Sequence, residues 1–445
     1  MKHLKYLYLI IMIFIGASCA KDQLPDSPAK MYDDVNSSNI FSPKIKIAVV
    51  SDIHYLDLSL MPVNPETNTY FQNDMCKDRK LTELSDPIFK NVISGLISEK
   101  PDIVLITGDL ANRGELASHE TVKNFLQQLE DEGMKVYVIP GNNDINSSKA
   151  VSYKSSPPEK VANINKDLFV TLYNNFGYNA TDEDARYRDP KSLSYICQPC
   201  TGLWILGIDA ITSGNGIINP ATMTWIQEKM VEANENNITV LAMMHYGILE
   251  HYTGQNGPEP PNGPEPLIKD SKANAIALMN AGIRLIFTGH YHANDIVDFV
   301  YEGKILSDIE TGSLVTPPCS YRIMTLDDNF IKIDTRRVTD VVSEITGEMD
   351  FLTYSDKNIT KRLNGFFCLY LPLLFNVTNE QAEFAAPYLT NGIKAYFAGD
   401  EKISPAEKNN IKVLEQYPYS SLFNLLNSFW TDLPPKDNKI HIKLK

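Results

Sequence analysis

The stretch "KVYVIPGNND", residues 135 to 144, joins a strand-like run to a short polar turn. Most of its first six residues are apolar, β-branched or aromatic, which favours a buried strand. The turn puts Asn142 and Asn143 directly after that strand. In an α/β fold, side chains at the carboxyl ends of strands line a crevice. The stretch therefore predicts an α/β fold with a candidate site at this strand end.

The same order of strand-like and helix-like segments runs through most of the chain. Short apolar runs occur at 45–50, 102–107, 135–140, 203–209, 238–244 and 284–289. Helix-length segments occupy residues 86–99 and 117–133, and the second closes on Gly133. This alternation predicts an α/β sheet whose functional groups lie on the loops that leave the strand ends.

The chain changes character twice after residue 294. The segments "IVDFVY", "KILSDIE", "YRIMTLD" and "FIKIDTRRV" follow without a helix between them, so we expect antiparallel strands that complete a second sheet. Residues 338–445 contain amphipathic stretches such as 380–399 and predict a smaller, mainly helical C-terminal region. The apolar run at 363–377 contains Pro372 and is too short for a membrane span, so we expect a buried helix.

The N-terminus has the features of a targeting segment. Lys2 and Lys5 precede an apolar run, which is followed by small residues and Cys19. Residues 1–19 resemble a bacterial lipoprotein signal, and an ordinary secretory signal or an uncleaved anchor are alternatives. The lipoprotein interpretation predicts export and tethering to a membrane through a lipidated Cys19, in the periplasm or at the cell surface. Residues 20–43 are polar with three prolines and predict a flexible tether.

Composition narrows the classes of partner. The chain has 41 Lys and Arg against 55 Asp and Glu, a net charge of −14, so no nucleic-acid binding is expected. A small anionic substrate would need a local source of positive charge. The pair Cys197 and Cys200 has no second cysteine pair at similar spacing, so a local disulfide or two plain thiols is favoured over a zinc site.

Metal-binding side chains follow five of these six strand-like runs. They are Asp52 and His54 in "SDIHY", Asp109 in "TGDL", Asn142 in "PGNND", His245 in "MMHYG", and His290 and His292 in "TGHYH". A single Asp or His after a strand is usually a turn former or a cap. Five such coincidences indicate a metal centre, because strand ends in an open sheet converge on one crevice.

These blocks, in this order from residue 52 to 292, resemble the calcineurin-like metallophosphoesterase superfamily. The resemblance covers roughly residues 45–335 and implies a four-layer α/β/β/α sandwich, for which we take 44–337 as the domain. It also implies that Asp52, His54 and His292 hold one ion, that Asn142, His245 and His290 hold another, and that Asp109 bridges both. The donor types suit two divalent or mixed-valence ions of iron, zinc or manganese.

Such a centre predicts a phosphoester hydrolase. Two cations about 3.5–4 Å apart can share a bridging hydroxide and bind phosphate oxygens during in-line displacement. With only two carboxylates among the ligands, the centre is net positive and attracts a small anionic phosphoester.

Asn143 departs from the family pattern, which has a histidine here that assists the leaving group. An amide donates a hydrogen bond but delivers no proton near neutral pH. Asn143 therefore favours a phosphodiesterase over a phosphomonoesterase. His251 is a candidate replacement donor, although a supporting or surface histidine is favoured, and His119 is expected to be structural. The Gly- and Pro-rich loop at 254–267 is expected to border the substrate cleft.

Three other functions compete with this interpretation. A phosphoanhydride hydrolase of the pyrophosphate type also needs little leaving-group assistance. A non-catalytic, metal-containing surface lipoprotein would explain Asn143, although all seven ligand positions are present. A thiol–disulfide exchanger based on Cys197 and Cys200 lacks a thioredoxin-like setting.

Overall fold

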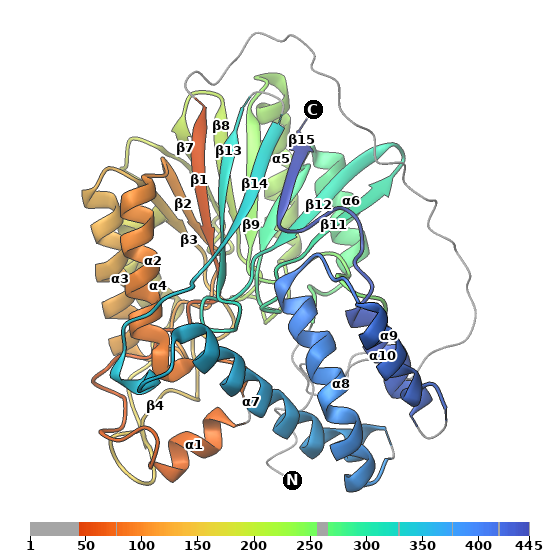
Figure 1. Ribbon diagram of the computed structural model, residues 1–445. Helices are drawn as coiled ribbons and strands as arrows, with labels where there is room; N and C mark the ends of the chain where they lie inside the picture. Colours follow the sequence, from red (N-terminus) through yellow and green to blue (C-terminus); the bar gives the residue numbers. More distant parts are fainter. Residues whose placement is uncertain are drawn as a thin grey trace.

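Two mixed β-sheets pack face to face at the centre of the molecule (Figure 1). The computed structural model describes residues 44–76, 78–255, 266–327, 330–375, 377–416 and 419–444. The predicted signal segment 1–19 with Cys19, the tether 20–43 and residues 256–265 of the predicted cleft loop lie outside the described residues.

The first sheet has six strands in the order β15-β14-β13-β1-β2-β3. These are β1 (Ile45–Val50), β2 (Ile103–Ile106), β3 (Lys135–Val138), β13 (Ser320–Leu326), β14 (Phe330–Arg337) and β15 (Lys439–Lys443). Strands β1, β2 and β3 are parallel, whereas β13 is antiparallel to β1. All four residues of β2 are buried because both faces of this sheet are covered.

The second sheet has seven strands in the order β11-β12-β10-β9-β8-β7-β6. These are β6 (Ala185–Arg188), β7 (Tyr195–Cys200), β8 (Leu203–Ile208), β9 (Thr239–Met244), β10 (Leu285–Thr288), β11 (Ile296–Tyr301) and β12 (Lys304–Glu310). Its central strands β8, β9 and β10 are parallel. A separate two-stranded ribbon pairs β4 (Val151–Ser152) with β5 (Glu159–Lys160).

The four strands after residue 294 are divided between the two sheets, so the prediction that they complete a single second sheet was wrong. β11 and β12 extend the second sheet, whereas β13 and β14 join the first sheet beside β1. Their sequences share no regular alternation of apolar and polar residues. The local pattern therefore indicates strands but does not select the sheet to which each strand belongs.

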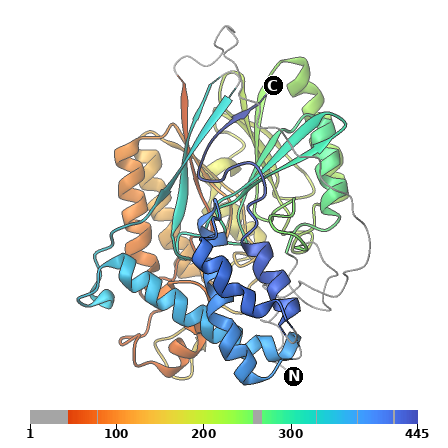
Figure 2. The ribbon, with the colours of Figure 1, turned by 45° about the vertical axis from the view of Figure 1, so that its right-hand side comes forward.

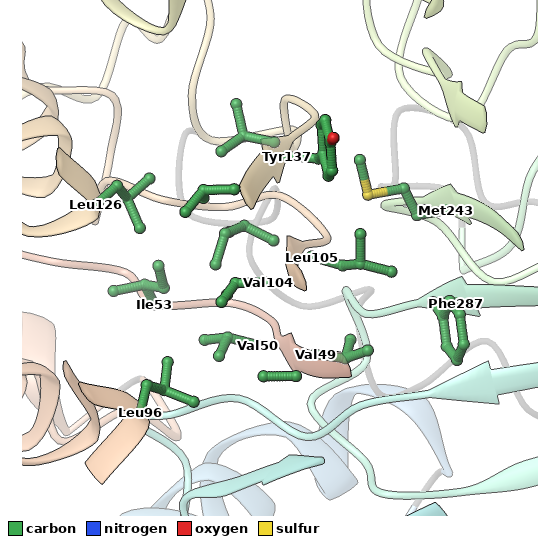
Figure 3. Close-up of a cluster of buried hydrophobic side chains, with 14 of the residues drawn as sticks. Val49, Val50, Ile53, Leu96, Val104, Leu105, Leu126, Tyr137, Met243 and Phe287 are labelled. Atoms are coloured by element: carbon green, nitrogen blue, oxygen red, sulfur yellow. The ribbon is translucent and has the colours of Figure 1, made fainter. Parts of the chain in front are cut away.

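Apolar side chains from both sheets interlock at the centre (Figure 3). Val49, Leu105 and Tyr137 lie in register on the first sheet, and Met243 and Phe287 lie in register on the second. All five side chains are at most 2% exposed. Burial of each aliphatic or aromatic side chain contributes roughly 1.5–3 kcal/mol, so this interface holds the two sheets in fixed positions.

Helices cover the outer faces of both sheets (Figures 1 and 2). Those beside the first sheet are α2 (Ser85–Glu99), α3 (Leu116–Asp131) and α4 (Lys166–Leu172), and those beside the second are α5 (Pro220–Glu235) and α6 (Ser271–Ala281). The structure thus confirms the predicted four-layer sandwich and the helices at 86–99 and 117–133. Shorter elements are α1 (Thr69–Met75), η2 (Thr82–Leu84), η3 (Asn174–Tyr178), η4 (Glu344–Thr346) and η5 (Lys412–Leu414).

The C-terminal region is largely helical, as predicted, and its last strand returns to the first sheet. Its helices are α7 (Phe351–Leu374), α8 (Asn379–Ala398), α9 (Pro405–Ile411) and α10 (Ser420–Phe429). They form an apolar cluster that also contains Tyr252 and Tyr291 of the sandwich. Pro372 lies within α7, and no helix in the described part of the chain is long and apolar enough to cross a membrane.

Arg322 of β13 connects these parts from a fully buried position. Its guanidinium donates to the backbone oxygen of Glu310 on β12 at 2.6 Å, and to that of Asp437 before β15 at 2.6 Å. Burial lowers the pKa of Arg322 to about 10, so the side chain is charged at neutral pH. One cation therefore links both sheets and the C-terminal segment.

Arg322→Met is expected to lower the stability to urea by about 3 kcal/mol, because buried carbonyl oxygens lose their donor. The control Arg336→Met removes an arginine of β14 that is 38% exposed and paired with Asp334, and should change stability by less than about 1 kcal/mol. Urea unfolding followed by circular dichroism measures both changes. Equal effects of the two substitutions would contradict the linking role of Arg322.

Candidate metal centre

The seven predicted ligands lie at neighbouring strand ends of both sheets. Asp52 and His54 follow β1, Asp109 follows β2, Asn142 follows β3, His245 follows β9, and His290 and His292 follow β10. The expectation that a single sheet supplies all of them was wrong, since β9 and β10 belong to the second sheet. The ligands still converge because the two sheets place these strand ends side by side.

The backbone at this centre has unusual conformations. Five of the seven ligand residues have a positive φ, between 43° and 74°. Non-glycine residues rarely adopt this region, and such strain concentrates at functional sites. The backbone N–H groups of Asp52 and His54 donate to the carbonyl oxygens of Gly108 and Asp109, which holds the first two turns together.

Glycines in the motifs allow the turns to approach closely. A Cβ atom added to Gly108 would lie 2.7 Å from the Nδ1 atom of His245, and one added to Gly141 would lie 2.2 Å from the backbone nitrogen of Asp109. At Gly289 an added Cβ would lie 1.9 Å from the Oγ atom of Ser51. Gly108, Gly141 and Gly289 are therefore required by the small space between turns.

The first cluster consists of Asp52, His54 and His292, all buried. The Nε2 atoms of His54 and His292 are 3.1 Å apart, and they lie 3.6 and 3.4 Å from Oδ1 of Asp52. Ligand atoms around an ion with bonds of about 2.0–2.1 Å are separated by about 3.0–3.4 Å. Oδ1 of Asp52 is buried and makes no hydrogen bond. The spacing and the unpaired oxygen both fit a shared cation.

The second cluster consists of Asn142, His245 and His290. Oδ1 of Asn142 lies 3.0 Å from Nε2 of His245 and 2.9 Å from Nδ1 of His290. Oδ2 of Asp109 lies 3.5 Å from Nε2 of His245 and also 3.5 Å from Nε2 of His54. One carboxylate oxygen therefore faces both clusters, which is the position that a bridging ligand occupies.

Further contacts orient the ligand atoms. Nδ1 of His245 donates to the carbonyl oxygen of Thr107 at 2.9 Å, which leaves its Nε2 lone pair free for a cation. Nδ1 of His292 lies 2.7 Å from the hydroxyl of Thr316. Oδ2 of Asp52 accepts from the backbone N–H of His290 at 2.9 Å. These bonds fix the orientation of two imidazole rings and one carboxylate. They do not involve Nε2 of either ring or Oδ1 of Asp52, which are the atoms that face the clusters.

The charges of the cluster are strongly coupled. Burial opposes the charge of His245, but Asp109 nearby raises its pKa to about 9, so a cation that binds there displaces a proton. Burial, together with His245, lowers the pKa of His290 to about 3. Burial opposes ionisation of Asp52, yet His292 and His54 hold its pKa well below the usual value. Two carboxylates are therefore available to divalent cations.

Asn143 lies directly beside the carboxylate that faces both clusters. Its backbone N–H donates to Oδ1 of Asp109 at 2.8 Å, and its side-chain amide donates to Oδ2 at 2.6 Å. Asn142 and Asn143 are half-buried, whereas the other six ligand residues are buried. The two asparagines therefore mark the side from which solvent reaches the centre.

The other two histidines singled out in the sequence lie in separate surroundings. His251 is 1% exposed, and its ring nitrogens lie 3.4 Å from Asp295 and 3.3 Å from Asp308. These carboxylates raise the pKa of His251 well above its ordinary value, although burial opposes this. Its surroundings are those of a buried, paired histidine rather than a surface one. His119 is fully buried in α3 against Tyr173, as expected for a structural residue.

Cys197 and Cys200 are free thiols in β7, which agrees with the interpretation as two plain thiols. Burial raises the pKa of Cys197, so this thiol is a poor nucleophile at neutral pH. Neither a disulfide nor a reactive pair is formed by them.

Sequence reasoning missed Asp144, which supports the turn after β3. This buried carboxylate accepts from the backbone N–H groups of Gly141 at 2.7 Å and Ala111 at 3.0 Å. It thereby connects the turns that carry Asn142 and Asp109. Its position in "PGNND" was a signal, because a polar residue after a strand often bonds nearby backbone groups.

Sequence reasoning also missed a source of positive charge next to the centre. Arg79 is 8% exposed and donates to the backbone oxygen of His290 at 3.4 Å. Lys80 is 7% exposed and pairs with Asp78 at 3.2 Å. Arg362 of α7 holds this segment by donating to the carbonyl oxygen of Lys80 and to Glu83. Residues 78–80 ("DRK") and 289–292 ("GHYH") are far apart in the sequence, and only the folded chain brings them together.

Comparisons with known proteins agree with this geometry. A family model described as calcineurin-like phosphoesterase matches residues 45–294, more than half of the chain. Among curated proteins, no sequence matches significantly.

Two solved structures match this chain at low sequence identity. A dimetal phosphatase from Danio rerio is 12% identical, with a TM-score of 0.45, over 66% of this chain and 96% of that protein. The purple acid phosphatase PPD1 from yellow lupin (Lupinus luteus) seeds is also 12% identical, with a TM-score of 0.38, over 67% of this chain and 52% of that protein.

The purified protein is expected to contain about two transition-metal ions per chain. His54→Ala and His245→Ala should each lower this content by about one ion, since each removes a ligand from a different cluster. His441→Ala, at an exposed histidine of β15, is the control and should retain both ions. Elemental analysis by mass spectrometry measures the content, and equal loss in all three variants would contradict the assignment.

Proposed function

Because this chain belongs to the calcineurin-like phosphoesterase family, we propose that it is a metal-dependent phosphodiesterase. The observation that carries the proposal is the convergence of seven ligands in two clusters around Oδ2 of Asp109, with an amide at position 143. The ligand set supports hydrolysis of a phosphoester. The amide supports the preference for diesters.

The protein supplies the positions of the reacting groups. When bound by the seven ligand residues, two metal ions would supply Lewis acidity and a nucleophilic hydroxide at neutral pH. The half-buried Asn143 and Asn142 lie on the open side, where an anionic phosphoester would enter. Arg79 adds positive charge beside His290 in a protein whose net charge is −14. This local field favours an anionic substrate.

The basicity of the leaving group decides how much a substrate gains from a proton donor. Asn143 can donate a hydrogen bond to an oxygen of the substrate but cannot transfer a proton near neutral pH. Alkyl monoesters, which have poor leaving groups, need that proton most. Activated diesters need it least, and phosphoanhydrides share this property. The preference for diesters over phosphoanhydrides rests on no single contact, so a pyrophosphate-type hydrolase is the second candidate.

His251 is the remaining candidate for a proton donor. Its ring is enclosed by Asp295, Asp308 and Glu310, and each ring nitrogen faces a carboxylate. These contacts favour a supporting role over proton transfer to a substrate. We therefore assign Asn143 as the residue that faces the leaving group.

We also propose a cellular location for the protein. Export and tethering of the protein to a membrane through a lipidated Cys19 would place the centre outside the cytoplasm. The support is the sequence of residues 1–19 alone.

Asn143→His is expected to increase hydrolysis of an alkyl monoester, glycerol phosphate, relative to bis-p-nitrophenyl phosphate by roughly 10- to 100-fold, because an imidazole can deliver a proton to the poor alkoxide leaving group. The wild type should prefer the diester. Asn124→His, on the exposed side of α3, is the matched control and should leave the ratio unchanged. Asp109→Asn serves as the inactive blank. A wild type that prefers the monoester would contradict the proposal.

Arg79→Met should lower kcat/KM for bis-p-nitrophenyl phosphate by about tenfold, because a buried cation next to the centre is lost. Metal content, measured in parallel, should stay near two ions per chain. Arg186→Met removes an exposed arginine of β6 and is the control. An unchanged kcat/KM in Arg79→Met would show that this charge does not act on the substrate.

A further inference from the structure

A pocket of about 330 Å³ lies at the edge of the second sheet, and none of the seven ligand residues lines it. Its walls are α4, the end of β6 with the turn that follows, and the segment after β8. Lys166, Arg188 and Lys191 contribute three cations to its lining, against the single carboxylate of Asp167. We propose that this pocket binds a second, terminal phosphate group of the phosphodiester substrate, an inference that rests on the proposed function.

Arg188, the last residue of β6, has a guanidinium that is held in place but not used by the chain. Its Cζ atom lies 4.5 Å from the centroid of the Tyr178 ring and 5.9 Å from that of the Tyr195 ring. Stacking on an aromatic face orients a guanidinium and leaves the N–H groups at its edge free. Its Nη1 atom is buried and has no hydrogen-bond partner. Because buried donors are normally paired, this side chain calls for an acceptor that the chain does not supply.

The charge of the lining favours a phosphate group. Three cations and one carboxylate give the lining two net positive charges, whereas the whole chain carries −14. Among the described residues, no carboxylate forms an ion pair with Lys166, Arg188 or Lys191. A phosphate monoester carries about −1.5 to −2 charges at pH 7, and an arginine binds it through two parallel N–H groups.

Two further carboxylates are buried behind the walls of the pocket. Asp189 accepts from the backbone N–H of Lys191 at 3.1 Å, and Asp209 accepts from that of Leu193 at 2.9 Å. Their oxygens are engaged by donors of the loops, and neither residue lines the pocket. These bonds hold the turn between β6 and β7 in a fixed position.

The pocket lies at the same end of the strands as the metal centre. β6 is antiparallel to β7, β7 is antiparallel to β8, and β8 is parallel to β9, so β6, β8 and β9 all run in one direction. Arg188 at the carboxyl end of β6 is therefore at the same end of the sheet as His245, which follows β9. Neighbouring strands are about 4.8 Å apart, which places the pocket roughly 5–15 Å from His245.

The wall formed by α4 is joined to the turn that carries Asn143. The backbone N–H of Asn146 donates to the carbonyl oxygen of Ile164 at 2.8 Å, and the side-chain amide of Asn163 donates to that of Ser147 at 2.6 Å. Asn143 lies on the side from which solvent reaches the centre. A substrate that enters there places one phosphate at the centre and the other in the pocket.

The test compares two diesters as substrates of the metal-loaded protein. One is p-nitrophenyl hexyl phosphate, and the other carries an additional phosphate on the sixth carbon of the hexyl chain, which spans roughly 10 Å, within the expected separation. The value of kcat/KM should be at least about tenfold higher for the phosphorylated diester, because hydrogen bonds between charged groups are strong. Equal values for the two diesters would overturn the proposal.

Arg188→Met should remove most of this preference, and Lys191→Met should reduce it by about threefold, since an exposed lysine contributes less than a stacked arginine. The ratio of two kcat/KM values does not depend on the fraction of folded enzyme, so misfolding cannot produce the change. Arg186→Met, at an exposed arginine two residues earlier in β6, is the matched control and should keep the full preference. A full preference in both pocket variants would contradict the assignment.

Calorimetric titration with hexyl phosphate separates this proposal from the proposed function. Asp109→Asn and Asp109→Asn/Arg188→Met share the same altered centre, so a difference in their affinities reports the pocket. We expect the second variant to bind at least about tenfold more weakly. If neither diester is hydrolysed but this difference is found, the phosphodiesterase activity is refuted and the phosphate site is supported. Equal affinities would overturn the phosphate site, and binding without any preference between hydrolysed diesters would overturn its assignment to the substrate.

Discussion

The apolar contact between the two sheets determines the positions of the functional groups. The row Val49, Leu105 and Tyr137 on the first sheet packs near Met243 and Phe287 on the second (Figure 3). A closely packed interior permits few relative shifts. The ligands that follow these strands are therefore held at separations of about 3 to 3.6 Å, although they come from five segments. The separations between the ligand atoms therefore depend on side-chain packing several residues away from the centre.

The centre itself is assembled against local preferences. Five ligand residues have a positive φ, and adjacent glycines leave room for only a hydrogen atom between turns. The carboxylate of Asp144 and backbone bonds between the turns offset this strain. Buried imidazoles and carboxylates would repel or titrate without a partner. A pair of metal ions would resolve both the unpaired oxygen of Asp52 and the cluster of ring nitrogens.

The C-terminal helices are part of the same structure. Their apolar cluster includes Tyr291, which lies between His290 and His292, and Tyr252, whose hydroxyl is 2.8 Å from that of Tyr291. Arg362 of α7 anchors the segment that carries Arg79 and Lys80. The helices thus support the ligand loop after β10 and the positive charge beside it. The largely helical region therefore contacts two of the segments that border the centre.

The sequence by itself determined the class of fold, the order of its strands and helices, and the seven residues that converge at the candidate centre, because each of these is encoded locally. Apolar runs define strands, and a glycine next to Asp, Asn or His at a strand exit indicates a ligand turn. Tertiary structure alone decided which sheet received β11 to β14, since no local pattern in these four segments selects one sheet over the other. It also decided that Arg79 meets His290, that His251 is enclosed by carboxylates, and that Asp400 lies beside Asp437. Those contacts join residues far apart in the chain, and no local pattern encodes a distance between them.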